Sequence, residues 1–484
     1  MKLNDILREV PYIKADGDLN IDIQGLHYDS RKVTPNSVFF CIEGFKVDGH
    51  EFAGSAVSKG ASVVVLRRDI PLPYDVTKVF VEDVRHSMAL FASAFYGHPS
   101  DELTLIGVTG TNGKTTITYM IKSILEKSGE AVGVIGTITN MIGKDVLPSE
   151  HTTPESVDLQ ALLKEMENRG VGKVAMEVSS HSLSLDRVIG CNFDVGIFTN
   201  LTQDHLDFHG TLENYLKAKA KLFDLSKTGV INIDDKSGQI ILEGIKGKSI
   251  TYGIDNHADV MAENINITAK GSEFDLCILN KDKVHISLNI PGDFSVYNAL
   301  ASAAACHAVG VPTQDIKDGL ENLQGVPGRF ELLNINTPYS VIVDYAHTPD
   351  GLKNILETAR NITEGRLITL FGCGGDRDAK KRPIMGEMAG KFSDLCIVTS
   401  DNPRTEEPMA IIKDILPGID RTGCPYVVIE NRREAISYAL KHAQPGDVVI
   451  LAGKGHETYQ ILKDRTIHFD EKEIVSELLG RDTE

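Results

Sequence analysis

The chain has 484 residues, a length that suggests about three domains. It carries 50 Lys and Arg against 68 Asp and Glu, and the net charge of −18 argues against a nucleic-acid-binding surface. Its seven cysteines form no C-x-x-C pair, which argues against a zinc ribbon or a disulfide framework and fits a reducing cytoplasm. The sequence shows no apolar signal segment and no run near the ~20 apolar residues of a membrane span, so we expect a cytoplasmic protein with no membrane insertion. We also expect a monomer.

Residues 1–97 predict a small α/β domain, because short strand-like runs alternate there with helical stretches. Its informative segment is Asp29-Ser30-Arg31, which follows a strand end and could hold a polar ligand. A turn with a local ion pair explains the same residues equally well. His98-Pro99-Ser100 marks the predicted boundary to a central domain over residues 98–330.

The central domain opens with a phosphate-binding loop. An apolar strand over residues 103–108 leads into GTNGKTT at 110–116 and then into a helical pattern at 119–125. Backbone N–H groups and the helix N-terminus would bind phosphate, Lys114 would reach the β- and γ-phosphates, and Thr115 would hold Mg²⁺. Val108 departs from the strict motif, which has Gly there, and the alternative is an ordinary glycine-rich turn.

Strands and helices alternate through this domain, so we expect a parallel sheet with helices on both faces and ligands beyond its strand ends. One strand at 173–178 carries Glu177 near its end, where it could hold Mg²⁺ or simply face solvent. The loop at 201–210 holds Asp204, His205, Asp207 and His209, which suit metal or phosphate, although a hydrogen-bonded turn uses similar residues.

A lysine stands on the apolar stripe of the next predicted helix, residues 211–225. The stripe consists of Leu212, Tyr215, Leu216, Leu222 and Phe223. Lys219 lies on it, whereas the two neighbouring lysines point away. A lysine there must snorkel, pair, lower its pKa or be chemically changed, and its place after the His/Asp loop favours a functional role.

Residues 226–290 predict an antiparallel insertion, and an Ala-rich helix with Asn298 follows over 294–309. A turn at 326–331 predicts the boundary to a third domain over residues 331–484. There, strand runs at 339–343, 366–371, 395–400 and 447–452 each end in an unusual loop. Intervening helices predict a Rossmann-like doubly wound sheet with all four loops on its C-terminal edge. The loop at 372–377 lacks the G-x-G-x-x-G spacing of dinucleotide-binding loops. We therefore do not expect this third domain to be a second nucleotide-binding domain that takes NAD.

Together, these motifs resemble the Mur ligase family, the ATP-dependent amide ligases of peptidoglycan precursor synthesis. The resemblance covers all three domains and is carried by GTNGKTT, the Asp204/His205 loop, Tyr215-x-x-Ala218-Lys219-x-x-Leu222-Phe223, PGRFE at 327–331 and DYAHTPD at 344–350. HTTP at 151–154 and EVSSH at 177–181 are similar to the branch that adds the third residue of the stem peptide. DNPR at 401–404 resembles the meso-diaminopimelate-adding members of that branch.

The resemblance implies roles for particular residues. ATP would be bound by Gly110, Thr111, Asn112, Gly113, Lys114, Thr115, Thr116, Asn298, Arg329, Asp344 and His347. Thr115 and Glu177 would hold one Mg²⁺, and His205 with a carbamylated Lys219 a second; Lys114, Lys219 and His205 would be catalytic. The UDP-linked substrate would contact Ser30, Thr152, Thr153, Ser179 and Arg187. Diaminopimelate would contact Arg377, Asp401, Asn402, Pro403, Arg404, Gly453 and Glu457.

The implied reaction phosphorylates the D-glutamate side-chain carboxylate of UDP-N-acetylmuramoyl-L-alanyl-D-glutamate, and the amine of meso-diaminopimelate then displaces phosphate. A lysine-adding member of the family is one alternative. A folylpolyglutamate synthetase-like ligase is another, although it should lack the Asp29-Ser30-Arg31 domain and the DNPR loop. A nucleotide-gated regulatory protein is the third, and two metal sites argue against it.

Overall fold

The computed structural model describes residues 1–480 except 46, 74, 269 and 280. The chain divides into two compact units, each described here by itself. Unit 1 comprises residues 1–109, 130–196 and 218–229, and unit 2 comprises residues 110–129, 197–217 and 230–484. Among the described residues, no helix is both long enough and apolar enough to cross a bilayer.

The first sheet of unit 1 has five strands in the order β1-β5-β4-β3-β2. Their bounds are β1 Lys14–Asp16, β2 Gly25–His27, β3 Ser37–Phe40, β4 Ala61–Leu66 and β5 Thr77–Phe80. Only the edge pair β1–β5 is antiparallel among its strand pairs in the described residues. Alternate residues of β3 enter different cores: Val38 and Phe40 pack on one face, Phe39 on the other. The predicted small α/β domain is therefore confirmed.

The helices of this region are α1 Leu3–Leu7, the 3₁₀ helix η1 Gly49–Phe52, α2 Ala53–Ser58 and α3 Val84–Tyr96. The longest, α3, begins at Asp83, whose side chain accepts hydrogen bonds from the N–H groups of Arg85 and His86. It ends at Gly97 in the left-handed conformation, φ 72°. Met88, Phe91 and Ala92 of α3 pack in the same core as Val38 and Phe40, which fixes this helix on one face of the sheet.

The largest sheet has eleven strands in the order β16-β15-β14-β13-β12-β11-β6-β10-β7-β8-β9. The bounds are β6 Thr104–Thr109, β7 Val132–Ile135, β8 Asn140–Ile142, β9 Asp145–Leu147, β10 Lys173–Glu177, β11 Phe193–Phe198, β12 Ser226–Asn232, β13 Lys248–Gly253, β14 Val260–Thr268, β15 Gly271–Ile278 and β16 Asp282–Leu288. Strand β10 pairs in parallel with both β6 and β7.

Two expectations for this sheet need correction. It is mixed rather than parallel, because β8 and β9 pair antiparallel at one edge and β14, β15 and β16 at the other. The segment predicted as an antiparallel insertion is antiparallel at β14–β15 and β15–β16, as expected, but it extends the same sheet and its pair β13–β14 is parallel. The physical reason lies in the connections, because short turns such as that between β8 and β9 allow only antiparallel pairing.

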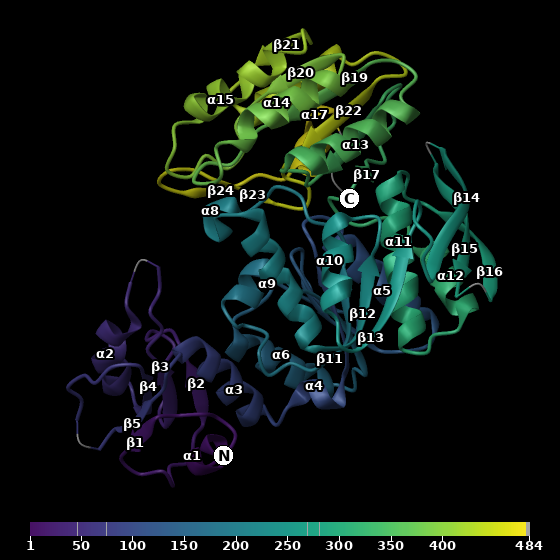
Figure 1. Cartoon of the computed structure of the whole chain (residues 1–484). Helices are drawn as coiled ribbons and strands as arrows, with labels where there is room; N and C mark the ends of the chain where they lie inside the picture. Colours follow the sequence, from purple (N-terminus) through teal and green to yellow (C-terminus); the bar gives the residue numbers. More distant parts are fainter. Residues whose placement is uncertain (46, 74, 269, 280, 481–484) are drawn as a thin grey trace. The chain divides into compact units, whose positions relative to one another are not determined.

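Figure 1 draws the helices of the central region, which alternate with these strands along the chain. Their bounds are α4 Pro99–Glu102, α5 Lys114–Lys127, α6 Ser156–Asn168, α7 Ser180–Ser184, α8 Leu206–His209, α9 Leu212–Asp224, α10 Lys236–Gly244, α11 Asp293–Ala308 and α12 Thr313–Asn322. Helix α9 buries Tyr215 and Leu222 as predicted, and Lys219 is buried with them at 1% exposure. Leu212 was predicted on the same stripe but is 47% exposed, because it occupies the first turn.

The third sheet has six strands in the order β17-β18-β22-β19-β20-β21. The bounds are β17 Glu331–Leu332, β18 Ser340–Asp344, β19 Leu367–Phe371, β20 Leu395–Val398, β21 Tyr426–Val428 and β22 Val448–Ala452, with a separate hairpin of β23 Tyr459–Ile461 and β24 Thr466–His468. All its pairs except the edge pair β17–β18 are parallel, as predicted.

Helices cover both faces of this sheet. The bounds are α13 Pro349–Ile362, α14 Lys381–Phe392, α15 Pro408–Asp420, α16 Arg432–His442 and α17 Glu471–Leu478. Ile342 and Ile450 face a core shared with α13, α14 and α15, whereas Val341 and Val449 face a core shared with α16 and α17. This doubly wound arrangement puts the loops after β18, β19, β20 and β22 at one sheet edge.

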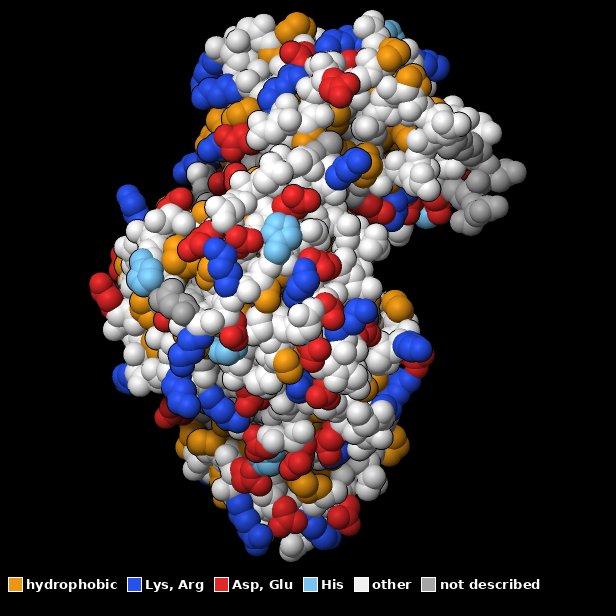
Figure 2. All heavy atoms as spheres, turned by 90° about the vertical axis from the view of Figure 1, so that its right-hand side faces the viewer, with side chains coloured by type: hydrophobic (Ala, Val, Ile, Leu, Met, Phe, Trp, Pro, Cys, Tyr) orange, Lys and Arg blue, Asp and Glu red, His pale blue; other side chains and the backbone are white. Residues whose placement is uncertain are grey.

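The surface carries charges of both signs. Figure 2 shows Lys and Arg side chains interspersed with Asp and Glu on the visible face, with hydrophobic side chains scattered between them.

One ion pair inside the third sheet is fully buried. Arg432 at the start of α16 and Glu471 at the start of α17 are paired at 2.8 Å, and both side chains are 0% exposed. Arg432 also donates to the carbonyl of Ala452 at the end of β22, 2.7 Å away. The pair therefore ties two helices to a strand end. Burial raises the pKa of Glu471, so this carboxylate depends on its partner to remain charged.

We predict that Arg432→Met lowers the free energy of unfolding by about 3–5 kcal/mol, because it leaves Glu471 as an uncompensated buried charge. Arg433→Met is the matched control. Arg433 pairs with Glu477 on the same helix α17, but that pair is half exposed, so its loss should change stability by less than about 1 kcal/mol. Urea unfolding of the full chain measures both values. Equal losses would contradict the assignment of the buried pair as a structural link.

Candidate active site

The phosphate-binding loop lies between β6, which ends at Thr109, and α5, which begins at Lys114. Gly110 and Gly113 adopt φ values of 147° and 91°, which L side chains rarely adopt. A Cβ on Gly110 would also collide with the Thr199 hydroxyl, so both conformation and space require glycine at this position. The predicted strand, glycine loop and helix are all present.

Residues after β11 fix the shape of this loop. The Thr111 N–H donates to the Asn200 carbonyl and the Asn112 N–H to the Asn200 side chain, both at 2.9 Å. The Thr199 hydroxyl donates to the Asn112 carbonyl at 2.7 Å. These residues were not predicted as part of the site. Their position directly after a buried strand is the signal that could have identified them.

The Lys114 ammonium lies over the loop that it is predicted to serve. It donates to the carbonyls of Gly110 and Thr111, each at 2.9 Å. A cation held above backbone N–H groups at a helix N-terminus is a suitable environment for phosphate oxygens. The geometry therefore fits a nucleoside triphosphate, and its phosphates would replace the two carbonyls as partners of Lys114.

Two predicted nucleotide residues border the same loop, and a third, His347, is held by other residues of unit 2. Arg329 donates from Nη2 to the Thr115 hydroxyl at 2.9 Å. Asn298 of α11 is so close to Gly113 that a Cβ there would lie 2.5 Å from its Oδ1. The His347 Nδ1 lies 3.0 Å from the Tyr345 carbonyl, and its Nε2 lies 3.9 Å from Asp204. Unit 2 therefore brings the side chains of Arg329 and Asn298 to the loop.

Asp344 takes part in the structure differently from the other predicted nucleotide residues. Its carboxylate accepts hydrogen bonds from the N–H groups of Phe330 and Ala346, both at 2.6 Å. Burial raises the pKa of this carboxyl group. Asp344 therefore connects the turn that carries Arg329 to the loop that carries His347. Whether it also contacts nucleotide stays a prediction.

Within unit 1, Glu177 sits at the end of β10, opposite Val108 in the parallel register with β6. Its side chain is 1% exposed, and it accepts hydrogen bonds from the Thr137 N–H at 2.8 Å and the Thr137 hydroxyl at 3.0 Å. The alternative interpretation, a strand-end glutamate that faces solvent, is therefore wrong, and the buried position argued for it is found. A buried, pre-oriented carboxylate is a suitable ligand for Mg²⁺.

Four residues predicted to contact the UDP-linked substrate gather around Glu177. The Thr152 hydroxyl lies 3.0 Å from that of Thr137, and the Thr153 hydroxyl donates to the Glu177 carbonyl at 2.9 Å. Ser179 donates its N–H to the Thr153 hydroxyl at 3.1 Å, and Arg187 donates to the Thr153 carbonyl at 3.0 Å. The Arg187 position is fixed further by Glu155, which it pairs with at 2.7 Å.

Ser30 belongs to the turn after β2, where its carbonyl accepts a hydrogen bond from Lys59 at 2.9 Å. The flanking residues Arg31 and Asp29 form an ion pair at 2.8 Å, which is one of the two interpretations that the sequence allowed. Arg31 lowers the pKa of Asp29 to about 2. The alternative interpretation of this motif therefore holds for Asp29 and Arg31, and the role of Ser30 stays a prediction.

Within unit 2, the loop before α8 places several charges together. Asp204 is buried and lies 3.3 Å from His205, 3.9 Å from His347 and 3.8 Å from Lys381. Burial opposes its ionisation, but these three groups lower its pKa to about 2. His205 has a left-handed φ of 52°, which sets the direction of its ring before α8. Lys381 was not predicted, because it lies far along the chain, at the start of α14.

The predicted metal ligands belong to different units, Glu177 and Lys219 to unit 1, and Thr115 and His205 to unit 2. Each unit presents chemistry that fits Mg²⁺, namely a buried carboxylate in one and a hydroxyl beside the phosphate loop in the other. The assembly of the four into two metal sites stays a prediction.

The loops after β19 and β20 meet through Arg404. Its φ is 53°, and its Nη1 donates to the Gly375 carbonyl at 2.8 Å. The expected alternative, an ion pair with Glu406 or Glu407, is absent from the described part of the chain. Glu406 pairs with Arg382 at 2.8 Å and Glu407 with Lys463 at 3.7 Å. Arg404 is therefore held by backbone carbonyls and forms no ion pair within 4.0 Å among the described residues. Its charge nevertheless contributes, after the hydrogen bond from Thr405, to the lowered pKa of Asp376.

The loop after β22 joins the same group. Asn402 donates from Nδ2 to Glu457 at 2.9 Å, and Gly453, with φ 113°, lies against Asp401. Burial alone would raise the pKa of Asp401, but Lys454 and Arg432 lower it below its ordinary value. Its buried Oδ1 lies 3.2 Å from the Lys454 ammonium. Pro403 lies between Asn402 and Arg404. The Arg377 side chain donates to the carbonyl of the preceding residue, Asp376, at 3.0 Å.

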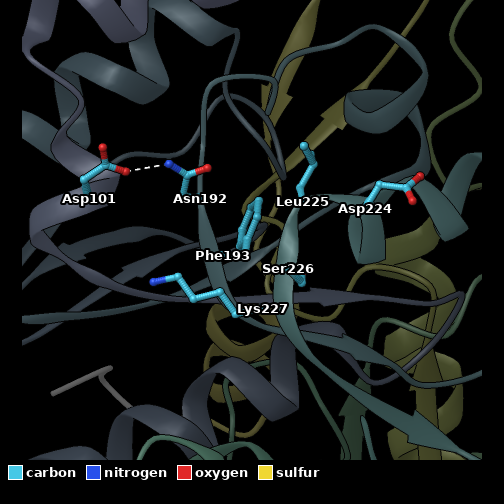
Figure 3. Close-up of a pocket in the computed structure, with 7 residues that line it drawn as sticks. All are labelled: Asp101, Asn192, Phe193, Asp224, Leu225, Ser226 and Lys227. Carbon is cyan, nitrogen blue, oxygen red and sulfur yellow. Dashed lines mark hydrogen bonds between the residues drawn. The ribbon is translucent and has the colours of Figure 1, made fainter. Parts of the chain in front are cut away.

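An open pocket of about 440 Å³ lies at the other edge of the largest sheet, where β11 and β12 begin (Figure 3). It is lined by Asp101, Asn192, Phe193, Asp224, Leu225, Ser226 and Lys227. Asn192 donates to Asp101 at 2.5 Å, and Lys227 donates to the neighbouring Asp194 at 2.8 Å. None of the predicted site residues lines it, because they follow strand ends rather than precede strands.

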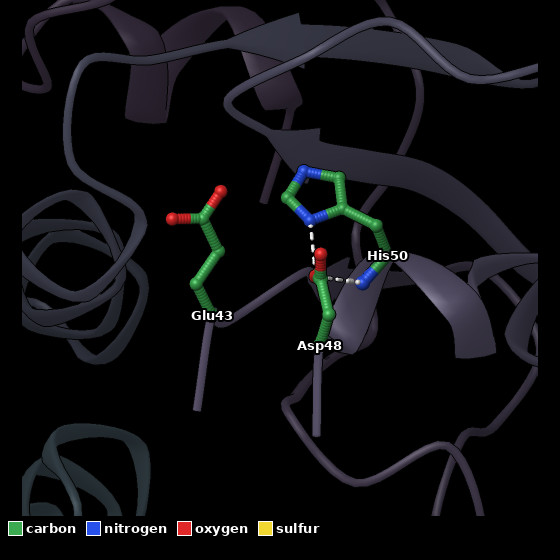
Figure 4. A group of neighbouring side chains, drawn as sticks. All are labelled: Glu43, Asp48 and His50. Atoms are coloured by element: carbon green, nitrogen blue, oxygen red, sulfur yellow. Dashed lines mark hydrogen bonds and ion pairs between the residues drawn. The ribbon is translucent and has the colours of Figure 1, made fainter. Parts of the chain in front are cut away.

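Glu43, Asp48 and His50 form a group with the composition of a metal site (Figure 4). Both ring nitrogens of His50 are engaged, Nδ1 with Asp48 at 2.6 Å and Nε2 with the Arg67 N–H at 3.3 Å. Arg67 pairs with Glu43, and Arg68 pairs with Asp48. Two arginines therefore already neutralise the carboxylates, and we interpret the group as a structural ion-pair cluster.

Three family models match the chain in succession. They are described as Mur ligase family, catalytic domain, at residues 22–96; Mur ligase middle domain, at residues 108–306; and Mur ligase, glutamate ligase domain, at residues 328–455. The order agrees with three domains. The precise boundaries predicted at residues 97/98 and 330/331 stay predictions.

Individual proteins are similar over the whole chain. The UDP-N-acetylmuramoyl-L-alanyl-D-glutamate--2,6-diaminopimelate ligase 1 of Clostridium acetobutylicum is 54% identical over 481 residues, covering 99% of each chain. A solved structure of a ligase with the same substrates in its name has 33% identity and a TM-score of 0.71, again over 99% of each chain. MurF ligase from Thermotoga maritima in complex with ADP, 19% identical, shares the fold with a TM-score of 0.65 over 94% of this chain and 96% of that one.

We predict that Lys114→Ala slows phosphoryl transfer from ATP at least about 100-fold, because removing one preorganised donor from a developing charge costs about 3 kcal/mol. Affinity for the UDP-linked substrate should hardly change, since its predicted residues lie in another part of the chain. Calorimetry with each ligand and a phosphate-release assay measure these effects. Loss of both ligands together would contradict the separation of the two binding regions.

Proposed function

Because the chain belongs to the Mur ligase family, we propose that it joins meso-diaminopimelate to UDP-N-acetylmuramoyl-L-alanyl-D-glutamate with ATP. The bond forms between an amino group of diaminopimelate and the side-chain carboxylate of the D-glutamate. The products are the extended UDP-linked precursor, ADP and phosphate. We place this reaction in the cytoplasm and assign it to a monomer.

The observation that carries the proposal is the meeting of three loops at the carboxyl edge of the third sheet. They present Arg404, which forms no ion pair among the described residues, and two buried or half-buried carboxylates, Asp401 and Glu457, which share the Lys454 ammonium at 3.2 and 3.0 Å. An amino-acid terminus carries one carboxylate and one ammonium group, so these loops offer each of them a group of opposite charge. The 54% identity to a diaminopimelate ligase supports the same substrate.

The first chemical step activates the substrate carboxylate, which is a poor electrophile as an anion. It takes the γ-phosphoryl group of ATP and becomes an acyl phosphate. Lys114 and the N–H groups of residues 110–116 would bind the phosphates while negative charge shifts from the γ-phosphate to the leaving ADP. Asn298 and Arg329 border the same loop. They would hold the nucleotide so that its phosphates meet these N–H groups.

Thr115 and Glu177 would hold one Mg²⁺, and His205 and a carbamylated Lys219 would hold a second. The two ions would neutralise phosphate charge. Carbamylation converts the Lys219 amine and CO₂ into a carbamate with release of a proton. The anion formed is a hard oxygen ligand, which explains why a lysine is found on the buried face of α9.

The second step is attack of the amine on the acyl phosphate, with phosphate as the leaving group. Thr152, Thr153, Ser179 and Arg187 would orient the muramoyl dipeptide, since they are already connected around Glu177. Asn402, Asp401 and Glu457 would hold one ammonium of diaminopimelate, and Arg404 and Arg377 a carboxylate. The amine at the other end is then free to react.

We predict that Lys219→Ala abolishes ligation and that high bicarbonate or a short-chain carboxylic acid partly restores it. The reason is that the added carboxylate can occupy the space of the missing carbamate. Lys217→Ala, which changes an exposed lysine of the same helix, is the matched control and should ligate normally. Phosphate release in the presence of all three substrates measures both variants. A fully active Lys219→Ala or a normal Lys219→Arg would refute the carbamate.

The proposed function is tested by kcat/KM for diaminopimelate and lysine in the wild type and in Arg404→Ala. Lysine lacks the second carboxylate, so it would leave Arg404 unpaired and partly desolvated, a penalty of about 1–3 kcal/mol. We expect the wild type to prefer diaminopimelate and the variant to lose most of that preference at unchanged ATP affinity. A wild type that prefers lysine would refute the proposed substrate, and unchanged selectivity in the variant would refute the role of Arg404.

A further inference from the structure

A lysine without an assigned role lies beneath the proposed amino-acid site. Lys454 follows β22 directly after Gly453, and its side chain is 0% exposed. A buried ammonium must be neutralised and must have its three protons satisfied, because water cannot reach it. The groups that provide this compensation therefore show what the lysine does.

All three protons of Lys454 have acceptors. The ammonium donates to Asn402 Oδ1 at 2.9 Å, to Glu457 Oε2 at 3.0 Å and to the Tyr459 carbonyl at 2.8 Å. Asp401 lies 3.2 Å away and interacts with the ammonium through charge, since its Oδ1 has no hydrogen bond among the described residues. Two of these partners, Asn402 and Glu457, are the side chains proposed to contact the amino acid.

The contact with Lys454 determines how the Asn402 amide is oriented. Its Oδ1 also accepts the N–H of Ile461 at 2.9 Å, so two donors fix that oxygen towards the protein interior. The amide nitrogen must then point the other way, and it donates to Glu457 Oε2 at 2.9 Å. Without the ammonium, one of the two donors that distinguish the oxygen from the nitrogen would be lost.

Glu457 is held in the same manner. Its Oε2 accepts from both Lys454 and Asn402, which fixes the carboxylate plane. The Tyr459 side chain also interacts with this carboxylate. Protein groups therefore set the direction in which Glu457 would meet a donor from outside the protein.

We propose that Lys454 is a positioning residue for the amino-acid substrate, holding the Asn402 amide and the Glu457 carboxylate in the single arrangement that binds an ammonium group. This inference rests on the proposed function, because that function makes Asn402 and Glu457 the substrate contacts. Lys454 touches neither substrate nor nucleotide in this scheme. It acts by orienting the two groups that do and by balancing the negative charge of Glu457 and Asp401.

The test compares Lys454→Met, Lys454→Arg and the control Arg366→Met in the full-length protein. Met has a similar length to the lysine stem but no charge. Arg366 pairs with the buried Asp447 at 2.7 Å at the other end of the same sheet, so its loss disturbs the domain without touching the amino-acid loops. The amino acid used is whichever of diaminopimelate and lysine the wild type prefers, so the result decides on Lys454 even if the proposed substrate is wrong.

We expect Lys454→Met to raise the KM of the amino acid by about tenfold or more, the effect of leaving buried polar groups wrongly paired, with the KM of ATP and of the UDP-linked substrate unchanged. The amino-acid KM of Lys454→Arg should lie between those of Lys454→Met and the wild type, because arginine keeps the positive charge but cannot reproduce the hydrogen-bond directions of the ammonium. Arg366→Met should lower Tm without changing any KM. An unchanged amino-acid KM in Lys454→Met, or equal increases in all three KM values, would overturn the proposal.

A double variant separates positioning from simple loss of stability. Glu457→Gln removes the charge that Lys454 neutralises, so Lys454→Met/Glu457→Gln should recover part of the Tm that Lys454→Met loses. The increase in amino-acid KM of the double variant should be smaller than the product of the two single increases, because Lys454 acts in part through this carboxylate. KM increases that multiply in the double variant would show that the lysine acts independently and would overturn the proposal.

Discussion

Parallel strand pairing is the constraint on which the functional arrangement depends. In a parallel sheet all carboxyl ends reach the same edge, so loops distant in sequence become neighbours without any contact between their own side chains. The register of β6 with β10 sets Val108 opposite Glu177, immediately before the phosphate loop begins. The registers of β19, β20 and β22 do the same for the loops that carry Asp401, Arg404 and Glu457.

Buried charges then convert these loops into rigid sites. Glu177 is held by the N–H and hydroxyl of Thr137, and Glu457 by Lys454 and Asn402. In each case a carboxylate that would be mobile in solvent has one orientation before any substrate binds. Preorganisation of this kind lowers the entropy lost on binding and directs charge at the reacting groups. The buried Arg432–Glu471 pair fixes helices α16 and α17 behind the third sheet in the same way.

Much of the fold was predictable from the sequence, because apolar runs with loops at their ends identify parallel strands. The phosphate loop and the burial of Lys219 followed from local patterns, glycine spacing and helical periodicity. The antiparallel pairing within residues 226–290 was also predicted, whereas the antiparallel edge formed by β8 and β9 was not. The motif at Asp29-Ser30-Arg31 supported two interpretations, and the structure shows the local ion pair.

Supporting residues were harder to find than the residues they support. Thr137, Thr199 and Lys454 act through hydrogen bonds to partners 40, 87 and 52 positions away, and a single sequence gives no sign of such pairings. Lys454 differs from Lys219 in this respect. Lys219 interrupts an apolar helical stripe and is conspicuous, whereas Lys454 stands between two glycines in a loop and resembles any solvent-exposed lysine.

The central claim is that the chain activates a carboxylate by phosphorylation before an amine attacks it. It is tested most directly by labelling the D-glutamate side-chain carboxylate of the UDP-linked substrate with ¹⁸O and analysing the phosphate released during ligation by mass spectrometry. An acyl phosphate transfers one carboxylate oxygen to phosphate when the amine displaces it, so the account predicts one labelled oxygen in each phosphate formed. Unlabelled phosphate accompanying full product formation would contradict it.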